Sequence, residues 1–164
     1  WKVTLVDTGV DTMTGGRVKK IEKFINNDED FMLTYGDGLA NVNINNLFNF
    51  HKKHKKIATV TTVRPAARFG EFKIKNNKII DFKEKPQHNS GWINGGFFVL
   101  NKKIFKYIKN SKSEIFERAP LEKLVKKKQL IPYFHDDFWR CIDSKRDLDL
   151  IKNLSRNKNI PWLK

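Results

Sequence analysis

Two aspartates occupy positions at which a carboxylate could bind a metal ion. Asp37 lies between two glycines directly after an apolar run at 31–35, and Asp143 follows the apolar segment 138–142. Open α/β sheets bind their ligands at the carboxyl ends of strands, and paired carboxylates there suit a hard cation such as Mg²⁺. Each residue also has a simpler interpretation, because Asp37 fits an ordinary Asp-Gly turn and Asp143 fits the beginning of a helix.

Glycines surround the first aspartate and recur later in the chain. Gly36 and Gly38 remove side-chain bulk, so the backbone can bend sharply or let a ligand approach closely. Gly95 and a second glycine follow Asn94, whose amide offers both a donor and an acceptor to a hydroxyl-rich ligand. The same glycine pair also fits a β-bulge.

Two further segments carry groups that bind phosphates and sugar hydroxyls. Glu84 and Lys85 precede Pro86, which favours an extended conformation; lysine binds phosphate as a point charge, and glutamate accepts hydrogen bonds from hydroxyls. Taken alone, this pair fits a solvated strand end better. Arg17 follows two glycines at an expected helix N-terminus, where free N–H groups bind anions.

The histidines and the cysteine indicate less. His51 and His54 lie three residues apart on a lysine-rich segment, and without further ligands nearby we expect them on the surface rather than on a metal, although the apolar periodicity of 45–54 also offers Phe50 or His51 to a core. Cys141 is the only cysteine, which excludes an intramolecular disulfide and favours a reducing, cytoplasmic location. No pattern of a Ser-His-Asp nucleophile is present.

The charge of the chain is strongly positive. Its 164 residues carry a formal net charge of +15, and 33 basic residues include only seven arginines. The lysines fall at the polar positions of amphipathic segments, so we interpret them as solvated helix faces rather than a nucleic-acid surface, for which arginine is preferred. Such a field would draw in small anionic substrates. No apolar stretch is long enough to predict a membrane span.

Apolar periodicity predicts an α/β protein that forms one unit, with a mixed, mostly parallel sheet flanked by helices. A hairpin is expected around Asn76-Asn77. The last helix should begin at Ser144, which stands at capping-box spacing from Asp147, and Thr14 is a candidate cap for the first. Strands are predicted at 3–6, 31–35, 57–63, 93–100, 130–135 and 138–143, and helices at 17–25, 45–54, 102–109, 119–128 and 144–154.

An ordered series of motifs is more specific than any of them singly. The chain shows VDTG, TMTGGR, LTYGDGLANV, RFGEFKI, IIDFKEKP, WINGGFFVL and FWRCIDSKRDLDLI in that order. This series resembles the sugar-phosphate nucleotidyltransferases, and within them the branch that uses CTP and glucose 1-phosphate. The resemblance runs over essentially the whole chain and implies the Rossmann-like fold of that family.

The resemblance also implies a role for each matched residue. Asp37 and Asp143 would bind Mg²⁺ and be catalytic, as would Lys85, which would hold the sugar phosphate. Nucleotide contacts would come from Thr12, Arg17 and Gly36, and contacts to the sugar phosphate from Glu84, Lys85, Asn94 and Gly95. A phosphate oxygen of glucose 1-phosphate would attack the α-phosphate of CTP and release pyrophosphate, with no protein nucleophile. The family further implies a homo-oligomer when the protein is full-length, and nucleotide sugars destined for O-antigen-type polysaccharide.

One departure from the family pattern changes the expectation for this chain. The glycine-rich GGxGTR loop and the signature lysine that cradle the triphosphate in the family are not found in this sequence. We therefore interpret residues 1–164 as one partial nucleotidyltransferase domain, without the N-terminal nucleotide-binding part, and expect weak or no activity from it alone. The alternatives are another sugar-1-phosphate specificity, or a non-catalytic remnant that binds anions.

Overall fold

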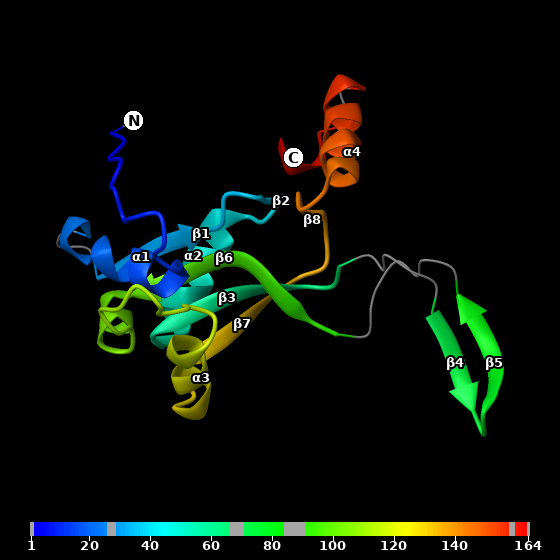
Figure 1. Ribbon diagram of the computed structural model, residues 1–164, viewed down its shortest axis with the longest axis horizontal. Helices are drawn as coiled ribbons and strands as arrows, with labels where there is room; N and C mark the ends of the chain where they lie inside the picture. The colour runs from blue at the N-terminus through cyan, green and yellow to red at the C-terminus, as the bar shows by residue number, and fades with distance from the viewer. Residues whose placement is uncertain (1, 26–28, 66–70, 84–90, 158–159, 164) are drawn as a thin grey trace.

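The computed structural model describes residues 2–25, 29–65, 71–83, 91–157 and 160–163. Its central feature is a four-stranded sheet in the order β1-β6-β3-β7 (Figure 1). The strands of this sheet are β1 (Asp30–Thr34), β3 (Ala58–Val63), β6 (Ile93–Asn101) and β7 (Leu130–His135). Strand β6 runs antiparallel to β1 and to β3, whereas β3 and β7 are parallel. The predicted mixed sheet is confirmed: three strands share one direction, and β6 opposes them.

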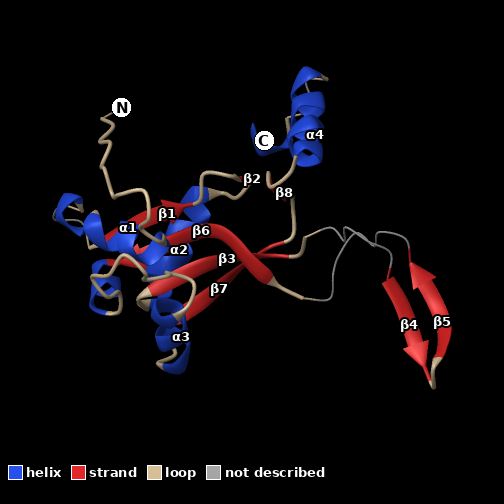
Figure 2. Ribbon diagram, viewed as in Figure 1, coloured by secondary structure: helices blue, strands red, loops and turns tan. Residues whose placement is uncertain are grey.

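Helices cover both faces of this sheet (Figure 2). Along β6, Phe98 and Leu100 belong to one apolar cluster and Val99, between them, belongs to another, as the alternation of a strand requires. The first cluster includes side chains from α1 (Thr14–Lys20), the 3₁₀ helix η2 (Lys102–Lys106) and α3 (Ala119–Lys126). The second includes Leu47 from α2 (Ile44–His54). The core therefore consists of two apolar layers that hold β6 between them.

Four smaller elements lie outside the central sheet and its covering helices. Strands β2 (Gly38–Ala40) and β8 (Trp139–Cys141) form an antiparallel pair, and α4 (Lys145–Arg156) follows β8. Ser144 caps α4 as predicted, because its side chain accepts a hydrogen bond from the Asp147 N–H at 3.2 Å. A short 3₁₀ helix, η3 (Pro161–Leu163), lies near the end of the chain. None of the described helices is long and apolar enough to cross a membrane.

The predicted hairpin is confirmed and stands apart from the main sheet in Figure 1. Strands β4 (Glu71–Lys75) and β5 (Lys78–Lys83) pair antiparallel around Asn76 and Asn77. Both asparagines have positive φ, 49° and 58°, which is the backbone that a type I′ turn needs. Asparagine tolerates this left-handed conformation better than most residues do, so the dipeptide explains the turn.

The N-terminal prediction was wrong in two respects. Residues 3–6 form no strand, and Leu5 is 92% exposed, because no neighbouring strand among the described residues pairs with them. The first helix begins at Thr14 rather than at 17, and it gives way after Lys20 to the 3₁₀ helix η1 (Glu22–Phe24). Thr14 is not the cap; Met13 holds that position, and the Thr14 hydroxyl donates instead to Glu117 at 2.7 Å. The predicted helix at 102–109 is likewise only the short η2.

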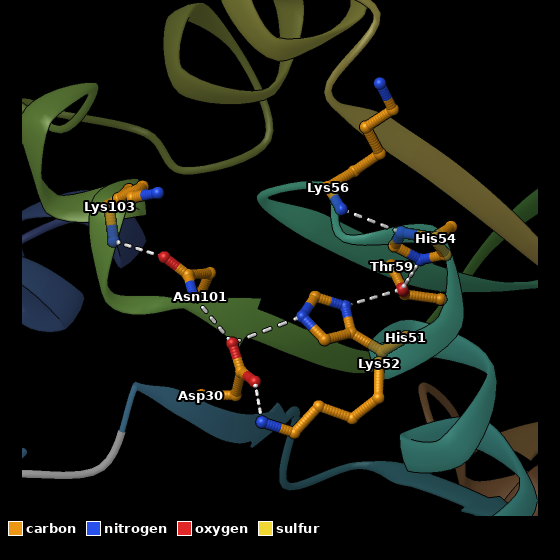
Figure 3. A network of polar contacts seen from close by, with 8 residues as sticks. All are labelled: Asp30, His51, Lys52, His54, Lys56, Thr59, Asn101 and Lys103. Carbon is orange, nitrogen blue, oxygen red and sulfur yellow. Dashed lines mark hydrogen bonds and ion pairs between the residues drawn. The ribbon is translucent and has the colours of Figure 1, made fainter.

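The two histidines of α2 were predicted on the surface, and His51 contradicts this most clearly, being 2% exposed. His51 follows Leu47 by four residues and therefore shares its buried face. Figure 3 shows the polar network that accommodates it. His51 Nε2 lies 3.4 Å from the carboxylate of Asp30, and its Nδ1 lies 2.8 Å from the hydroxyl of Thr59. That hydroxyl is also 2.7 Å from Nε2 of the half-buried His54.

The hydrogen bonds of this network require a neutral His54, and all of them are satisfied by a neutral His51. The Lys56 N–H donates to His54 Nδ1 at 2.9 Å, so that nitrogen carries no proton. His54 Nε2–H can then donate to Thr59, whose hydroxyl proton is left for His51 Nδ1. Burial lowers the pKa of His51, although the Asp30 carboxylate opposes the shift, and burial together with His51 lowers the pKa of His54. Protonation of His54 would break a donor–acceptor pair.

Acidification should therefore destabilise the fold before the carboxylates titrate. Both histidines have a lower pKa in the folded state than the value of about 6.5 that they have in the unfolded state. Between about pH 6.5 and these folded-state pKa values, the unfolded state therefore binds more protons than the folded state, and stability falls as the pH falls. Unfolding by urea at a series of pH values should show full stability above that window and a progressive loss within it. His54→Gln, at a partly exposed position, should flatten this slope, and an unchanged slope would contradict the assignment.

Candidate active site

A cleft of about 370 Å³ opens where β1 ends, β6 begins and β2 pairs with β8. It is lined by four of the predicted or implied groups, namely Asp37, Asp143, Asn94 and Gly95. These residues come from segments up to 106 positions apart, and the pairing of the strands brings them together. The cleft also lies at the carboxyl end of β1, which is where the sequence placed the site.

The β2–β8 pair brings the two aspartates together. Gly38 lies opposite Cys141, and the N–H of Ile142 donates to the backbone oxygen of Asp37 at 2.9 Å. One ligand atom each from Asp37, Cys141 and Asp143 lies within 4.8 Å of the others. Both carboxylates are exposed to the cleft.

This donor set suits a hard cation through its oxygens only. The Cys141 thiol donates a hydrogen bond to Asp143 Oδ1 at 3.1 Å. Burial, with the neighbouring carboxylates, raises the pKa of Cys141 to about 12, so the sulfur stays protonated and does not act as a thiolate ligand. Two carboxylates with space beside them match Mg²⁺, which commonly binds one or two protein carboxylates and completes its shell with water and substrate phosphates.

The glycine pair forms an irregularity in β6 that opens the opposite wall. Val60 pairs with Phe98 and Thr62 with Asn94, so β6 has three residues between these pairs where β3 has one. A Cβ on Gly95 would lie 2.9 Å from the backbone oxygen of Thr61. Gly96 has φ +81°, and a Cβ there would lie 2.9 Å from the ring of Tyr35. The bulge interpretation of the Asn94-Gly95-Gly96 segment is confirmed, and the same residues lie in the wall of the cleft, where their contact with a sugar stays a prediction.

Asn94 is held in one orientation by this bulge. Its Oδ1 accepts from the N–H of Gly96 at 2.8 Å, and its Nδ2 donates to the Tyr35 hydroxyl at 3.2 Å. On the other side of the bulge, the indole N–H of Trp139 donates to the backbone oxygen of Gly95 at 2.8 Å. These contacts fix the cleft wall before any ligand enters.

A chain of hydrogen bonds connects the cleft with Thr14 at the beginning of α1. The Tyr35 hydroxyl donates to Glu117 Oε1 at 2.5 Å, while the Thr14 hydroxyl donates to Glu117 Oε2 at 2.7 Å. The N–H of Phe116 donates to Thr14 in turn, at 3.0 Å. Burial, reinforced by the bond to Glu117, raises the pKa of Tyr35, so the phenol remains a donor. Glu117 was not identified from the sequence, where it looks like one more helix-flanking acid.

The remaining implied nucleotide ligands lie elsewhere or are open to solvent. Thr12 is buried, and Arg17 donates to the Thr8 hydroxyl at 2.6 Å and to the Val10 oxygen at 2.9 Å. Neither residue lines the cleft. Gly36 is exposed in the turn after β1, and a Cβ there would meet no atom within 4 Å. Glu84 and Lys85 lie outside the described residues, so their predicted roles stay predictions.

Arg140 is a site residue that sequence reasoning missed. It lies on β8 opposite Leu39, and it lines the cleft together with both aspartates. An arginine among the lining residues of such a cleft can bind the phosphate oxygens of a substrate when its side chain turns into the cleft. Its sequence signal was weak: one charged residue inside an otherwise apolar strand.

Comparison with known proteins shows which family the chain belongs to. The family model described as Nucleotidyl transferase matches residues 8–150. The chain is 41% identical over 162 residues to the glucose-1-phosphate cytidylyltransferase of Salmonella typhimurium, covering 99% of this chain and 63% of the relative. It is 42% identical over 148 residues to a probable glucose-1-phosphate cytidylyltransferase of Bacillus subtilis, covering 90% and 58%. The chain thus spans less than two thirds of the length of these relatives.

Solved structures support the fold. An apo UDP-glucose pyrophosphorylase superposes with a TM-score of 0.68 at 18% identity, covering 94% of this chain and 64% of that one. A putative glucose-1-phosphate thymidylyltransferase from Bacillus anthracis superposes with a TM-score of 0.63 at 22% identity, covering 93% and 63%. The match of the family model to residues 8–150 means that this chain belongs to the nucleotidyl transferase family.

Proposed function

We propose that the protein transfers a cytidylyl group from CTP to glucose 1-phosphate, giving CDP-glucose and pyrophosphate with Mg²⁺ as the cofactor. The observation that carries this proposal is the 41% identity to a glucose-1-phosphate cytidylyltransferase over nearly the whole chain. The two aspartates of the cleft support the metal side of this proposal, and Asn94 in its wall supports the sugar side. We further propose that residues 1–164 belong to one domain, and that the homo-oligomer and cytoplasmic location implied earlier apply to the full-length protein.

Four residues of the cleft have a defined part in this proposal. Asp37 and Asp143 would hold the cation, which when bound neutralises phosphate charge. Arg140 would bind phosphate oxygens, and Asn94 would hydrogen-bond a sugar hydroxyl. A phosphate oxygen of glucose 1-phosphate then forms a bond to the α-phosphorus of CTP as the bond to the leaving pyrophosphate breaks. The rate comes from holding two polyanions in line, so the side chains position and neutralise but form no covalent bond.

The test is an assay of pyrophosphate release by the protein at its full natural length. CTP and glucose 1-phosphate together should give pyrophosphate, and each alone should give none. Replacing CTP by UTP, GTP or dTTP tests the base, and replacing glucose 1-phosphate by mannose 1-phosphate tests the sugar. If another pair is preferred, the cytidylyl assignment fails. If no pair reacts while anions bind with a strong salt dependence, the protein is a binding remnant.

Tyr35→Phe should weaken the use of glucose 1-phosphate more than that of CTP. The change removes the hydroxyl that lies between Asn94 and Glu117, so the Asn94 amide loses one of its two fixed contacts. A loss of one hydrogen bond of roughly 1 kcal/mol corresponds to about a fivefold higher KM for the sugar phosphate. Initial rates with either substrate varied would show this, whereas an equal rise in both KM values would contradict a local effect.

A further inference from the structure

A second and larger cleft, of about 880 Å³, lies at the opposite end of the central sheet. Its walls include Asp30 at the beginning of β1, Asn101 at the end of β6, Ile57 just before β3 and Gln129 just before β7. The candidate active site lies at the other ends of these strands, where Asn94 is near the beginning of β6. Seven residue steps along β6 correspond to roughly 23 Å. The two clefts are therefore separate.

Lysine dominates the walls of this second cleft. Five lysines line it, against the two acids Glu29 and Asp30. They come from the end of α2, from η2 and from the segment after α3, and they are Lys52, Lys55, Lys56, Lys103 and Lys127. Helix α2 ends at this cleft and α3 ends close by, and each helix end contributes about half a negative charge. The five lysines carry five positive charges, and the two carboxylates and two helix ends together carry about three negative ones. A net charge of about +2 therefore remains in the cleft.

The acid at the floor of the cleft is already occupied by partners within the protein. Asp30 accepts from Lys52 at 2.6 Å and from Asn101 at 2.7 Å, and His51 contacts it as well (Figure 3). Burial raises the pKa of Asp30, but the bonds from Lys52 and Asn101 outweigh this and hold it below its ordinary value. The carboxylate is therefore ionised and neutralised locally, mainly by Lys52. Asp30 therefore does not compensate the charge of the other four lysines.

Lys56 and Lys103 lie on two sides of this network. Figure 3 shows Lys56 extending away from the Asp30–His51 pair, and Lys103 on the other side of Asn101. The backbone beneath each is fixed: Lys56 N–H donates to His54, and Lys103 N–H donates to Asn101 at 3.1 Å. Cations that are held on separate elements around one hollow repel each other, and a multiply charged anion between them would relieve that repulsion.

We infer that this lysine-lined cleft binds a small phosphate-bearing anion of at least two negative charges. The site is remote from the cleft that contains Asp37 and Asp143, which we call the aspartate cleft. The volume leaves space for more than a bare diphosphate, so a nucleoside diphosphate or a sugar phosphate belongs to the class that fits. Binding would join the end of α2 to η2 across the amino end of the sheet. Such a ligand would stabilise the fold through its preference for the folded state.

The test uses inorganic pyrophosphate as the probe, titrated calorimetrically into the full-length protein in EDTA at constant ionic strength. Without a divalent cation, the aspartate cleft should contribute little. The site variant combines Lys55→Gln, Lys56→Gln and Lys103→Gln. The matched control combines Lys73→Gln, Lys75→Gln and Lys78→Gln on the exposed β4–β5 hairpin, which removes the same charge elsewhere.

The site variant should bind pyrophosphate at least about tenfold more weakly, and the control should change by less than about twofold. Equal weakening in both variants would assign the binding to the general positive field and overturn the site. Loss of binding in Arg140→Gln would place the anion in the aspartate cleft and overturn it too. Lys103→Gln alone should give an intermediate loss, which keeps the test decisive if the triple variant folds poorly. None of these outcomes depends on catalysis.

Discussion

Asp37→Asn should lower pyrophosphate release from CTP and glucose 1-phosphate by at least about 100-fold at a fixed Mg²⁺ concentration. The substitution keeps the shape of the side chain but removes one of the two carboxylates that would bind the cation in the aspartate cleft. A neutral amide oxygen binds a hard cation more weakly, so part of the lost rate should return as Mg²⁺ is raised. Initial rates measured across a Mg²⁺ series would separate this recovery from a general loss of folded protein.

Asp149→Asn provides the matched control. Asp149 is half-exposed on α4 and pairs with Lys145 at 3.2 Å, an exposed pair whose loss costs only a few tenths of a kcal/mol. The control should retain nearly full activity and an unchanged Mg²⁺ dependence. Comparable losses in the two variants would show that charge in this part of the molecule matters generally, and the metal assignment of Asp37 would then be wrong.

The elements that were predicted well share a strong local signal. The run 57–63 is rich in β-branched residues and became β3, which is buried along nearly its whole length. Asn76-Asn77 predicted its turn because the two residues supply the positive φ values that the turn requires. In both cases the preference of a few neighbouring residues decides the structure.

The elements that were predicted poorly depend on partners far away in the chain. An apolar run such as residues 3–6 becomes a strand only beside another strand, and no local pattern contains that information. His51 was misassigned because the lysines around it dominate the pattern, although its spacing from Leu47 places it on the buried face.

The candidate site was predicted in part for the same physical reason. The positions of Asp37 and Asp143 at strand ends are local facts, but their proximity results from the β2–β8 pairing across about a hundred residues. The roles of Tyr35 and Glu117 were not predictable, because their hydrogen bond joins residues 82 positions apart. A polar side chain that positions a site is hard to identify from the sequence when its hydrogen-bond partner lies far away along the chain.

Phe98→Ala should produce the largest loss of stability among the substitutions considered. Phe98 lies on β6, is 1% exposed, and makes edge contacts with the rings of Phe116 and Tyr35 at 5.6 and 5.9 Å. Truncating a buried phenylalanine costs about 3–5 kcal/mol through lost transfer energy and the cavity that remains. That is a large share of the roughly 5–15 kcal/mol that stabilises a typical domain. Urea unfolding should show a lower midpoint with an unchanged slope.

Phe72→Ala is the matched control, because it makes the same change at a largely exposed position. Phe72 is 58% exposed on the hairpin and packs mainly on Phe82, with ring centroids 4.9 Å apart. Loss of this cross-strand pair should cost less than about 1 kcal/mol. The difference in the free energy of unfolding between the two variants isolates the contribution of the core. A Phe98→Ala variant that is no less stable than the control would contradict the prediction. Because the Phe98 ring also supports Tyr35, its loss should loosen the wall that holds Asn94 in the aspartate cleft.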